Sequence, residues 1–148
     1  MSIEIERALL SDLQRLNEIS FEAKSHWDYP QEWLDLWKED LKLTPEEFPE
    51  RSVFKLVSDG STIGFCAILE SETEYEVEHL WVLPQSIGLG LGKKLLEYCL
   101  AETILKDKPV IVASDPNAEG FYRKQGFETF AQRESVPAGR TLPLMKKK

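Results

Sequence analysis

A glycine-rich loop between an apolar strand and an amphipathic helix constrains this chain most strongly. Residues 85–93 read QSIGLGLGK, after the apolar residues 80–83 and before the helical pattern of residues 93–105. Glycines let backbone N–H groups approach a ligand, and a helix N-terminus carries a partial positive charge. The loop therefore predicts a site for an anion such as a pyrophosphate, unless it is only a tight strand-to-helix turn.

Two common phosphate-binding motifs do not fit this loop. A P-loop that ends at Lys93 requires glycine at position 87 and Ser or Thr at position 94, but the chain has Ile87 and Lys94. A dinucleotide fingerprint that begins at Gly88 requires Gly or Ala where Lys93 stands. The loop is therefore expected to hold a phosphate group of another kind of ligand.

Length and charge limit the classes of protein that remain. The chain has 148 residues and no repeat or linker, so we expect one domain, residues 1–148, with one core and one site. Its net charge of −8 argues against nucleic acid or an anionic membrane as a partner. Cys66 and Cys99 lie in apolar runs, which predicts reduced core thiols and no metal site. Without a signal peptide or an apolar span, a cytoplasmic location is expected.

Hydrophobic periodicity predicts the order of the elements along the chain. Ser11 and Gln14 form a capping-box pattern at the start of a first helix, and Pro30 begins a second helix that runs to Leu41. Asp59 and Gly60 mark a hairpin turn. The expected order is strand, two helices, three strands, helix, strand, helix and two strands, which indicates an α/β (α+β) fold with a mostly antiparallel sheet.

Two motifs in this order resemble those of the GCN5-related N-acetyltransferase (GNAT) superfamily. Gln85, Gly88 and Gly90 match its coenzyme A signature Gln-x-x-Gly-x-Gly, directly after a strand. Residues 117–127, NAEGFYRKQGF, resemble its second recurrent segment, an aromatic pair followed by Gly-Phe. The resemblance covers essentially the whole chain. It implies a mixed, mostly antiparallel sheet of six to seven strands, flanked by about four helices and splayed at the central strands.

The resemblance also implies which residues bind acetyl-CoA, the expected cosubstrate. The strand backbone before the loop is expected to bind the pantetheine arm as an added strand would, and the loop amides are expected to bind the pyrophosphate. Asp115 departs from the family, which often has Asn there, so we expect it to serve only as a helix cap. The cofactor-binding candidates are Leu80, Trp81, Val82, Gln85, Ser86, Ile87, Gly88, Leu89, Gly90 and Asn117.

Acetyl transfer to an amine needs a base for the ammonium proton and an acid for the leaving thiolate. Tyr122 matches the family position of the general acid, although it could simply pack helix against sheet. Strand alternation places Glu76 and Glu78 on one face, where family members carry a base that acts through water, although a solvated row of glutamates is also plausible. His79 points to the opposite face if the strand is regular, and it is the weaker candidate.

Two further segments are candidates for the acceptor site. His26, Trp27 and Tyr29 lie between the first two helices, which in this fold form one wall of that site, although they could instead cap the core. Arg140 lies between the last two strands, in the opposite wall, where it could bind an acceptor carboxylate.

The sequence therefore predicts an acetyl-CoA-dependent N-acetyltransferase that acts on a primary amine, expected to be a small molecule, by direct attack in a ternary complex. Acetylation of a protein N-terminus or lysine, and a non-catalytic coenzyme A-binding module, remain alternatives. The negative charge favours a cationic amine as acceptor. A homodimer remains open.

Overall fold

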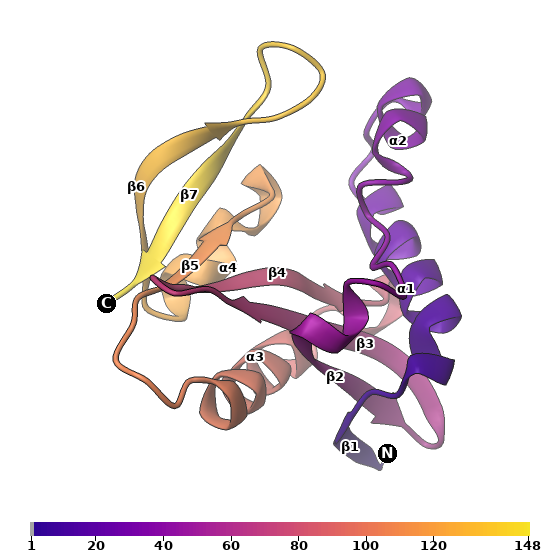
Figure 1. The fold of residues 1–148 in the computed structure, drawn as a ribbon. Helices are drawn as coiled ribbons and strands as arrows, with labels where there is room; N and C mark the ends of the chain where they lie inside the picture. Colours follow the sequence, from indigo (N-terminus) through magenta and orange to yellow (C-terminus); the bar gives the residue numbers. More distant parts are fainter. Residues whose placement is uncertain (1) are drawn as a thin grey trace.

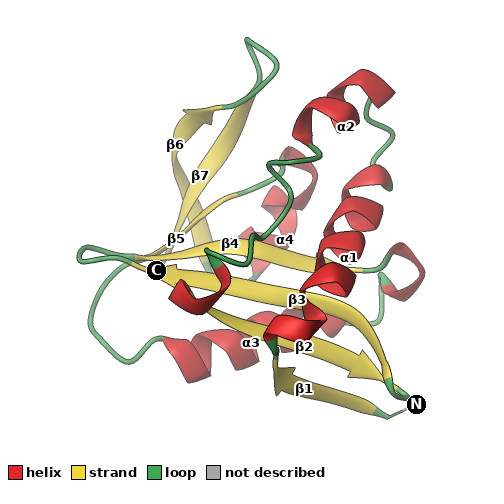
Figure 2. Ribbon diagram, turned by 45° about the vertical axis from the view of Figure 1, so that its right-hand side comes forward, coloured by secondary structure: helices red, strands yellow, loops and turns green. Residues whose placement is uncertain are grey.

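One mixed sheet of seven strands organises residues 2–148, the part of the chain that the computed structural model describes (Figures 1 and 2). Four α-helices and several 3₁₀ turns connect the strands in the order that the sequence predicts. The strands are β1 (Ile3–Arg7), β2 (Arg51–Ser58), β3 (Ser61–Glu70), β4 (Tyr75–Val82), β5 (Val110–Ala113), β6 (Phe127–Glu134) and β7 (Thr141–Lys147). The helices are α1 (Leu13–Ser25), α2 (Gln31–Trp37), α3 (Leu91–Thr103) and α4 (Glu119–Lys124).

The strand order across the sheet is β1-β2-β3-β4-β5-β7-β6. The first four strands form an antiparallel meander, β5 is parallel to β4, and β7 is antiparallel to both β5 and β6. The predicted mixed and mostly antiparallel sheet is therefore confirmed. The parallel pair needs a crossover, and α3 supplies it.

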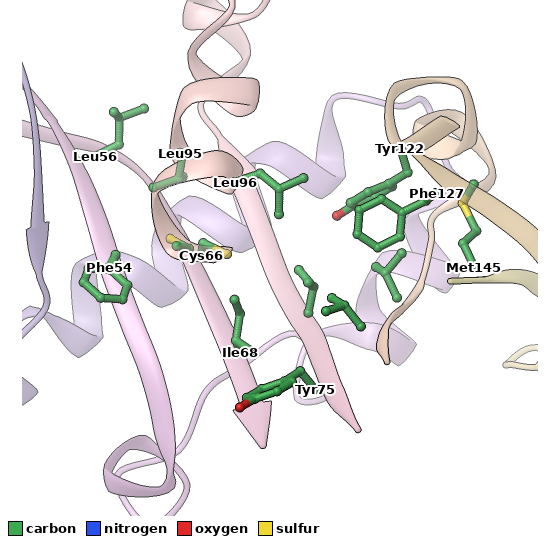
Figure 3. Packing of buried hydrophobic residues seen from close by; sticks show 14 of the residues in the cluster. Phe54, Leu56, Cys66, Ile68, Tyr75, Leu95, Leu96, Tyr122, Phe127 and Met145 are labelled. Atoms are coloured by element: carbon green, nitrogen blue, oxygen red, sulfur yellow. The ribbon is translucent and has the colours of Figure 1, made fainter. Parts of the chain in front are cut away.

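Helices cover both faces of the sheet, and each face has its own apolar core. On one face, α1 buries Leu16 and Ile19 against Phe65 of β3. On the other, α3 packs over β2, β3 and β4, and Tyr122 of α4 joins the same larger cluster beside β6. Figure 3 shows this second core, with Phe54 and Leu56 near one end and Tyr122, Phe127 and Met145 near the other.

The two cysteines belong to this larger core, as predicted. Cys66 on β3 and Cys99 on α3 are both fully buried and both are free thiols. They behave as small apolar side chains that fill the space between sheet and helix.

Two helix ends differ from the prediction for local reasons. The Ser11–Gln14 capping box does not form, because Asp12 accepts the Leu9 N–H at 2.8 Å and a 3₁₀ turn precedes α1. The second helix ends at Trp37 and not at Leu41, where turns replace it. By contrast, the hairpin turn at Asp59 and Gly60 is as predicted, with positive φ at both residues.

The arrangement leaves two projections on the same side of the sheet. In Figures 1 and 2, the β6–β7 hairpin rises above the region where β4 and β5 meet, and α2 rises opposite it, above α1. No helix within residues 2–148 combines the length and the apolar character needed to cross a membrane.

Candidate active site

The strands β4 and β5 separate after a short parallel pairing. Residues Tyr75–Val77 of β4 pair with Val110–Val112, and β4 continues for five more residues without a partner on that side. The chain after β5 turns toward β7, because the Ser114 N–H donates to the Pro143 carbonyl at 2.9 Å. The predicted splay is confirmed, and it opens one edge of β4 over residues 78–82.

A bulge in β4 determines which backbone groups face this open edge. The pairing with β3 steps from Ile68↔Val77 to Ala67↔His79, so Glu78 is an extra residue. Beyond it, the Leu83 N–H donates to the Ile63 carbonyl at 2.8 Å, toward β3.

Backbone groups alternate in direction along a strand, so those of Trp81 also face β3, and those of Leu80 and Val82 face the open edge. A Cβ at Gly64 would lie 2.6 Å from the Trp81 carbonyl oxygen, so that carbonyl points at β3. Among the three predicted strand contacts, Leu80 and Val82 therefore offer backbone donors and acceptors to a ligand, and Trp81 does not.

The glycine loop continues from this edge into the start of α3. Gly88 and Gly90 have φ of +91° and +74°, which favours glycine, and Gly90 is the N-cap of α3. Nothing lies within 4 Å of a Cβ at either position, so backbone conformation and not crowding requires these glycines.

The loop amides differ in their availability. Ser86 and Ile87 donate to the Leu83 and Pro84 carbonyls at 2.9 and 3.2 Å within a 3₁₀ turn, so they are occupied. Within the described chain, the amides of Gly88, Leu89 and Gly90 have no hydrogen-bond acceptor. Together with the first turn of α3 they form a set of backbone donors that suits a pyrophosphate.

Tyr122 lies in the core next to the open edge. Its ring contacts Phe121 and Phe127 edge-on, with centroids 5.2 and 5.4 Å away (Figure 3). Tyr122 therefore helps to pack α4 against the sheet, which is the alternative role that the sequence left open. Burial raises the pKa of its hydroxyl, which is therefore a proton donor at neutral pH. The Tyr122 hydroxyl has no hydrogen-bond partner within residues 2–148. It is nevertheless not among the fully enclosed polar side-chain atoms without a partner, of which the described residues have only Thr103 Oγ1, so it keeps some exposed surface.

Glu76 and Glu78 face the α1 side of the sheet, and each has an arginine partner. Both oxygens of Glu78 accept from Arg51, at 2.8 and 3.4 Å, and this contact raises the pKa of Arg51. Glu76 accepts from Arg133 through Oε2 alone, at 3.2 Å. Glu76 therefore keeps one carboxylate oxygen without a protein partner in the described structure.

His79 faces the same side as the two glutamates, and the expectation that it points away was wrong. The bulge at Glu78 reverses the alternation, so the His79 ring lies 5.5 Å from the Phe65 ring on the α1 face. Its Nδ1 accepts from Trp81 Nε1 at 3.0 Å, so the neutral ring carries its proton on Nε2. Desolvation lowers the pKa of His79 to about 4, despite the nearby charge of Glu78. His79 is therefore neutral at pH 7 and its free nitrogen is a donor, which does not suit a base.

Asp115 caps the turn before α4 as predicted, and its carboxylate also contacts side chains from distant segments. Its Oδ1 accepts the Asn117 N–H at 2.8 Å, while Oδ2 pairs with Lys24 of α1. The Tyr29 hydroxyl donates to this carboxylate at 2.9 Å, and Arg140 Nη2 lies 3.8 Å from it.

The predicted acceptor-site residues divide into two groups. Tyr29 and Arg140 are brought together, because Arg140 Nη2 donates to the Tyr29 hydroxyl at 3.3 Å. Asn117, which was predicted as a cofactor contact, joins them, since its Nδ2 donates to the same hydroxyl at 3.1 Å. His26 and Trp27 contact each other edge-on at 4.9 Å but face solvent, with Trp27 39% exposed. Among these predicted residues, only Tyr29 and Arg140 are therefore hydrogen-bonded to each other across the two walls.

Two residues of this region were not predicted from the sequence. Lys24 is buried, and its ammonium lies 4.7 Å from the ring centre of Trp37. Trp37 Nε1 in turn donates to the Val136 carbonyl of the β6–β7 hairpin at 2.7 Å. The signal for Lys24 was its position on the apolar face of α1 with Leu13, Leu16 and Ser20, where a lysine requires a buried acid.

Desolvation lowers the pKa of Lys24, and Asp115 partly offsets this. Burial by itself would raise the pKa of Asp115, but the hydrogen bond and the charge of Lys24 hold it below its usual range. Residues 2–148 contain no group of three or more His, Cys, Asp or Glu side chains arranged to hold a metal ion.

The chain is similar to known acetyltransferases in sequence and in fold. The chain is similar to the peptidyl-lysine N-acetyltransferase YiaC of Escherichia coli, with 24% identity over 131 residues that cover 83% of this chain and 82% of that protein. It is also similar to the peptidyl-lysine N-acetyltransferase YjaB of Salmonella typhimurium, with 28% identity over 106 residues that cover 70% and 69% of the two chains.

Among solved structures, the PaiA N-acetyltransferase of Thermoplasma acidophilum in complex with coenzyme A has the same fold. It superposes with a TM-score of 0.76 and 22% identity, covering 100% of this chain and 99% of that one. The model of the acetyltransferase (GNAT) domain matches residues 21–148. The chain therefore belongs to the GNAT family, as the two motifs predict, and it is an acetyl-CoA-dependent N-acetyltransferase.

Proposed function

We propose that this enzyme acetylates a primary amine of a small molecule by direct attack in a ternary complex. The open edge of β4 carries the proposal, because its free backbone groups at Leu80 and Val82 lead to the free amides of Gly88 to Gly90. The edge suits a pantetheine arm with its amides, and the loop suits a pyrophosphate. In this pose the acetyl thioester lies between the separated strands β4 and β5, on the side where Tyr122 lies.

In this mechanism the amine nitrogen attacks the thioester carbonyl, a C–N bond forms, and the C–S bond breaks. Tyr122 donates its proton to the leaving sulfur, and burial, which raises the pKa of the hydroxyl, keeps it protonated until then. Glu76 accepts the ammonium proton through water, because its Oε1 has no partner in the described structure. Glu78 is the weaker candidate, since Arg51 binds both of its oxygens.

The contacts between α2 and the β6–β7 hairpin favour a small acceptor. Trp37 donates to the Val136 carbonyl, and Arg140 donates to the Tyr29 hydroxyl, so the two walls are joined by side chains. Such closure leaves less room for a polypeptide than an open groove would. The net charge of −8 favours a cationic amine.

A peptide lysine is the second candidate acceptor. It is favoured by the two similar bacterial enzymes, which are peptidyl-lysine N-acetyltransferases. Both candidates use the same cosubstrate and the same chemistry, and they differ only in how the acceptor enters.

A panel of acceptors, read by release of free coenzyme A thiol, tests the proposal. Small diamines, polyamines and amino acid amides are compared with lysine-containing peptides at equal amine concentration. We expect kcat/KM to be highest for a small amine. Higher kcat/KM for the peptides would reverse the choice of acceptor. Binding of acetyl-CoA without release of its thiol in the presence of any amine would indicate a non-catalytic binding module. The cytoplasmic location and a homodimer stay predictions.

A further inference from the structure

Asp115 is the centre of a buried polar cluster that the acetyl transfer chemistry does not explain. Its side chain is 11% exposed, and those of Lys24 and Arg140 are 8% and 10% exposed. Both carboxylate oxygens are in use, with Oδ1 bound to the Asn117 N–H and Oδ2 to Lys24. The Tyr29 hydroxyl lies within 3.0 Å of both oxygens.

This cluster joins segments that lie far apart in the sequence. Lys24 belongs to α1, Tyr29 to the loop before α2, Asp115 to the turn before α4, and Arg140 to the β6–β7 hairpin. The Trp37 ring contacts both cations, with Lys24 Nζ at 4.7 Å and Arg140 Cζ at 4.4 Å from its centre. Both projections of Figures 1 and 2 are therefore tied to the turn before α4.

The cluster requires a carboxylate at position 115. Two nearly buried cations face one buried anion there, and a buried charge without a partner is costly. An asparagine could still accept the Asn117 N–H through its amide oxygen, but it would remove the negative charge opposite Lys24 and Arg140. Lys24 and Arg140 therefore need the negative charge of Asp115 between them.

We propose that Asp115 is a positioning residue that holds the 26–30 loop and the β6–β7 hairpin as the two walls of the acceptor site. This inference rests on the proposed function, because it assigns the acceptor to the space that these walls limit. Tyr29 and Arg140 then act through Asp115 and do not bind the acceptor carboxylate. The expected result of loosening the walls is weaker binding of the acceptor, while the cosubstrate site on β4 and the glycine loop is unchanged.

Asp115→Asn is the first test, because it keeps the size of the side chain and the helix cap. Loss of a buried charged hydrogen bond is expected to raise the acceptor KM about tenfold, with the acetyl-CoA KM within about twofold of wild type. Asp12→Asn is the matched control: Asp12 also caps a turn and binds a lysine, Lys55 at 3.1 Å, but lies outside this site. It should leave both KM values unchanged. An unchanged acceptor KM in Asp115→Asn, or an equal rise in the acetyl-CoA KM, would overturn the proposal.

Tyr29→Phe is the second test, and it keeps the aromatic ring. It removes only the hydroxyl that contacts Asp115, Asn117 and Arg140. If Tyr29 acts through Asp115, the double variant should raise the acceptor KM no more than Asp115→Asn does. Additive effects would show that Tyr29 contacts the acceptor directly and would contradict the proposal.

Hydrogen–deuterium exchange keeps the test independent of activity. Asp115→Asn should speed exchange in both the 26–30 loop and the 135–140 hairpin, while exchange in α3 stays as in wild type. Unchanged exchange in either wall would refute the positioning role even if no acceptor is found. A wild-type enzyme without acetyl transfer to any amine would refute the proposed function, and the exchange result would still stand by itself.

Discussion

Lowering the pH should destabilise this protein because His79 becomes protonated on unfolding. This effect begins at pH values well above those at which carboxylates protonate. Burial on the α1 face lowers the pKa of His79 to about 4, from 6.5 in an unfolded chain. The unfolded state therefore binds more protons than the folded state between these two values. The stabilisation is fully present above pH 6.5 and is lost as pH falls toward 4.

The magnitude follows from the size of the shift. A difference of about 2.5 units at 1.36 kcal/mol per unit corresponds to about 3 kcal/mol for complete loss. At pH 5 the linkage relation gives a loss of about 2 kcal/mol relative to pH 8. Asp115, Glu47 and Glu70 also have lowered pKa values, and their contributions are lost as pH falls from the usual values, 3.8 for Asp and 4.5 for Glu, toward the lowered ones.

Urea unfolding followed by tryptophan fluorescence at several pH values from 5 to 8 measures this loss. The control is His79→Gln, which does not titrate and still offers an acceptor to Trp81 Nε1. Its free energy of unfolding should fall about 2 kcal/mol less than that of wild type between pH 8 and pH 5. The reasoning is refuted if the two proteins lose stability in parallel over this range. A proton NMR titration of His79 with a midpoint near 6.5 would contradict it equally.

Three further predictions concern the site. Tyr122→Phe keeps the ring packing with Phe127 but removes the proposed acid, so turnover should fall at least about a hundredfold with unchanged acetyl-CoA affinity; unchanged turnover would remove this role. Glu76→Gln should lower kcat more than Glu78→Gln in steady-state assays, and the reverse order would identify Glu78 as the general base. Gly64→Ala places a Cβ 2.6 Å from the Trp81 carbonyl and should cost about 2 kcal/mol in urea unfolding. Gly92→Ala, whose Cβ would meet Phe121 at 3.6 Å, is its tolerated control, and equal stability of the two variants would contradict the register of β4.

The sequence alone determined the order of the elements and predicted where the cosubstrate binds. The hydrophobic period of a strand is two residues and that of a helix is three to four, and both are properties of one segment of the chain. The strand β4, the glycine loop and α3 could therefore be recognised without knowing which segments pack against them. The same is true of the helix cap at Asp115, because its partner Asn117 is two residues away. Glycines that need positive φ at positions 88 and 90 are local signals too.

Only the tertiary structure decided the direction of the side chains near the site. The alternation of residues 75–82 looks regular in the sequence, and the pairing with β3 introduces the bulge at Glu78 that turns His79 to the other face. The buried partners of Asp115 come from positions 24, 29 and 140, which no local pattern connects. The physical reason is that the energies of buried pairs depend on which distant segments meet, whereas a sequence pattern records only the period of one segment.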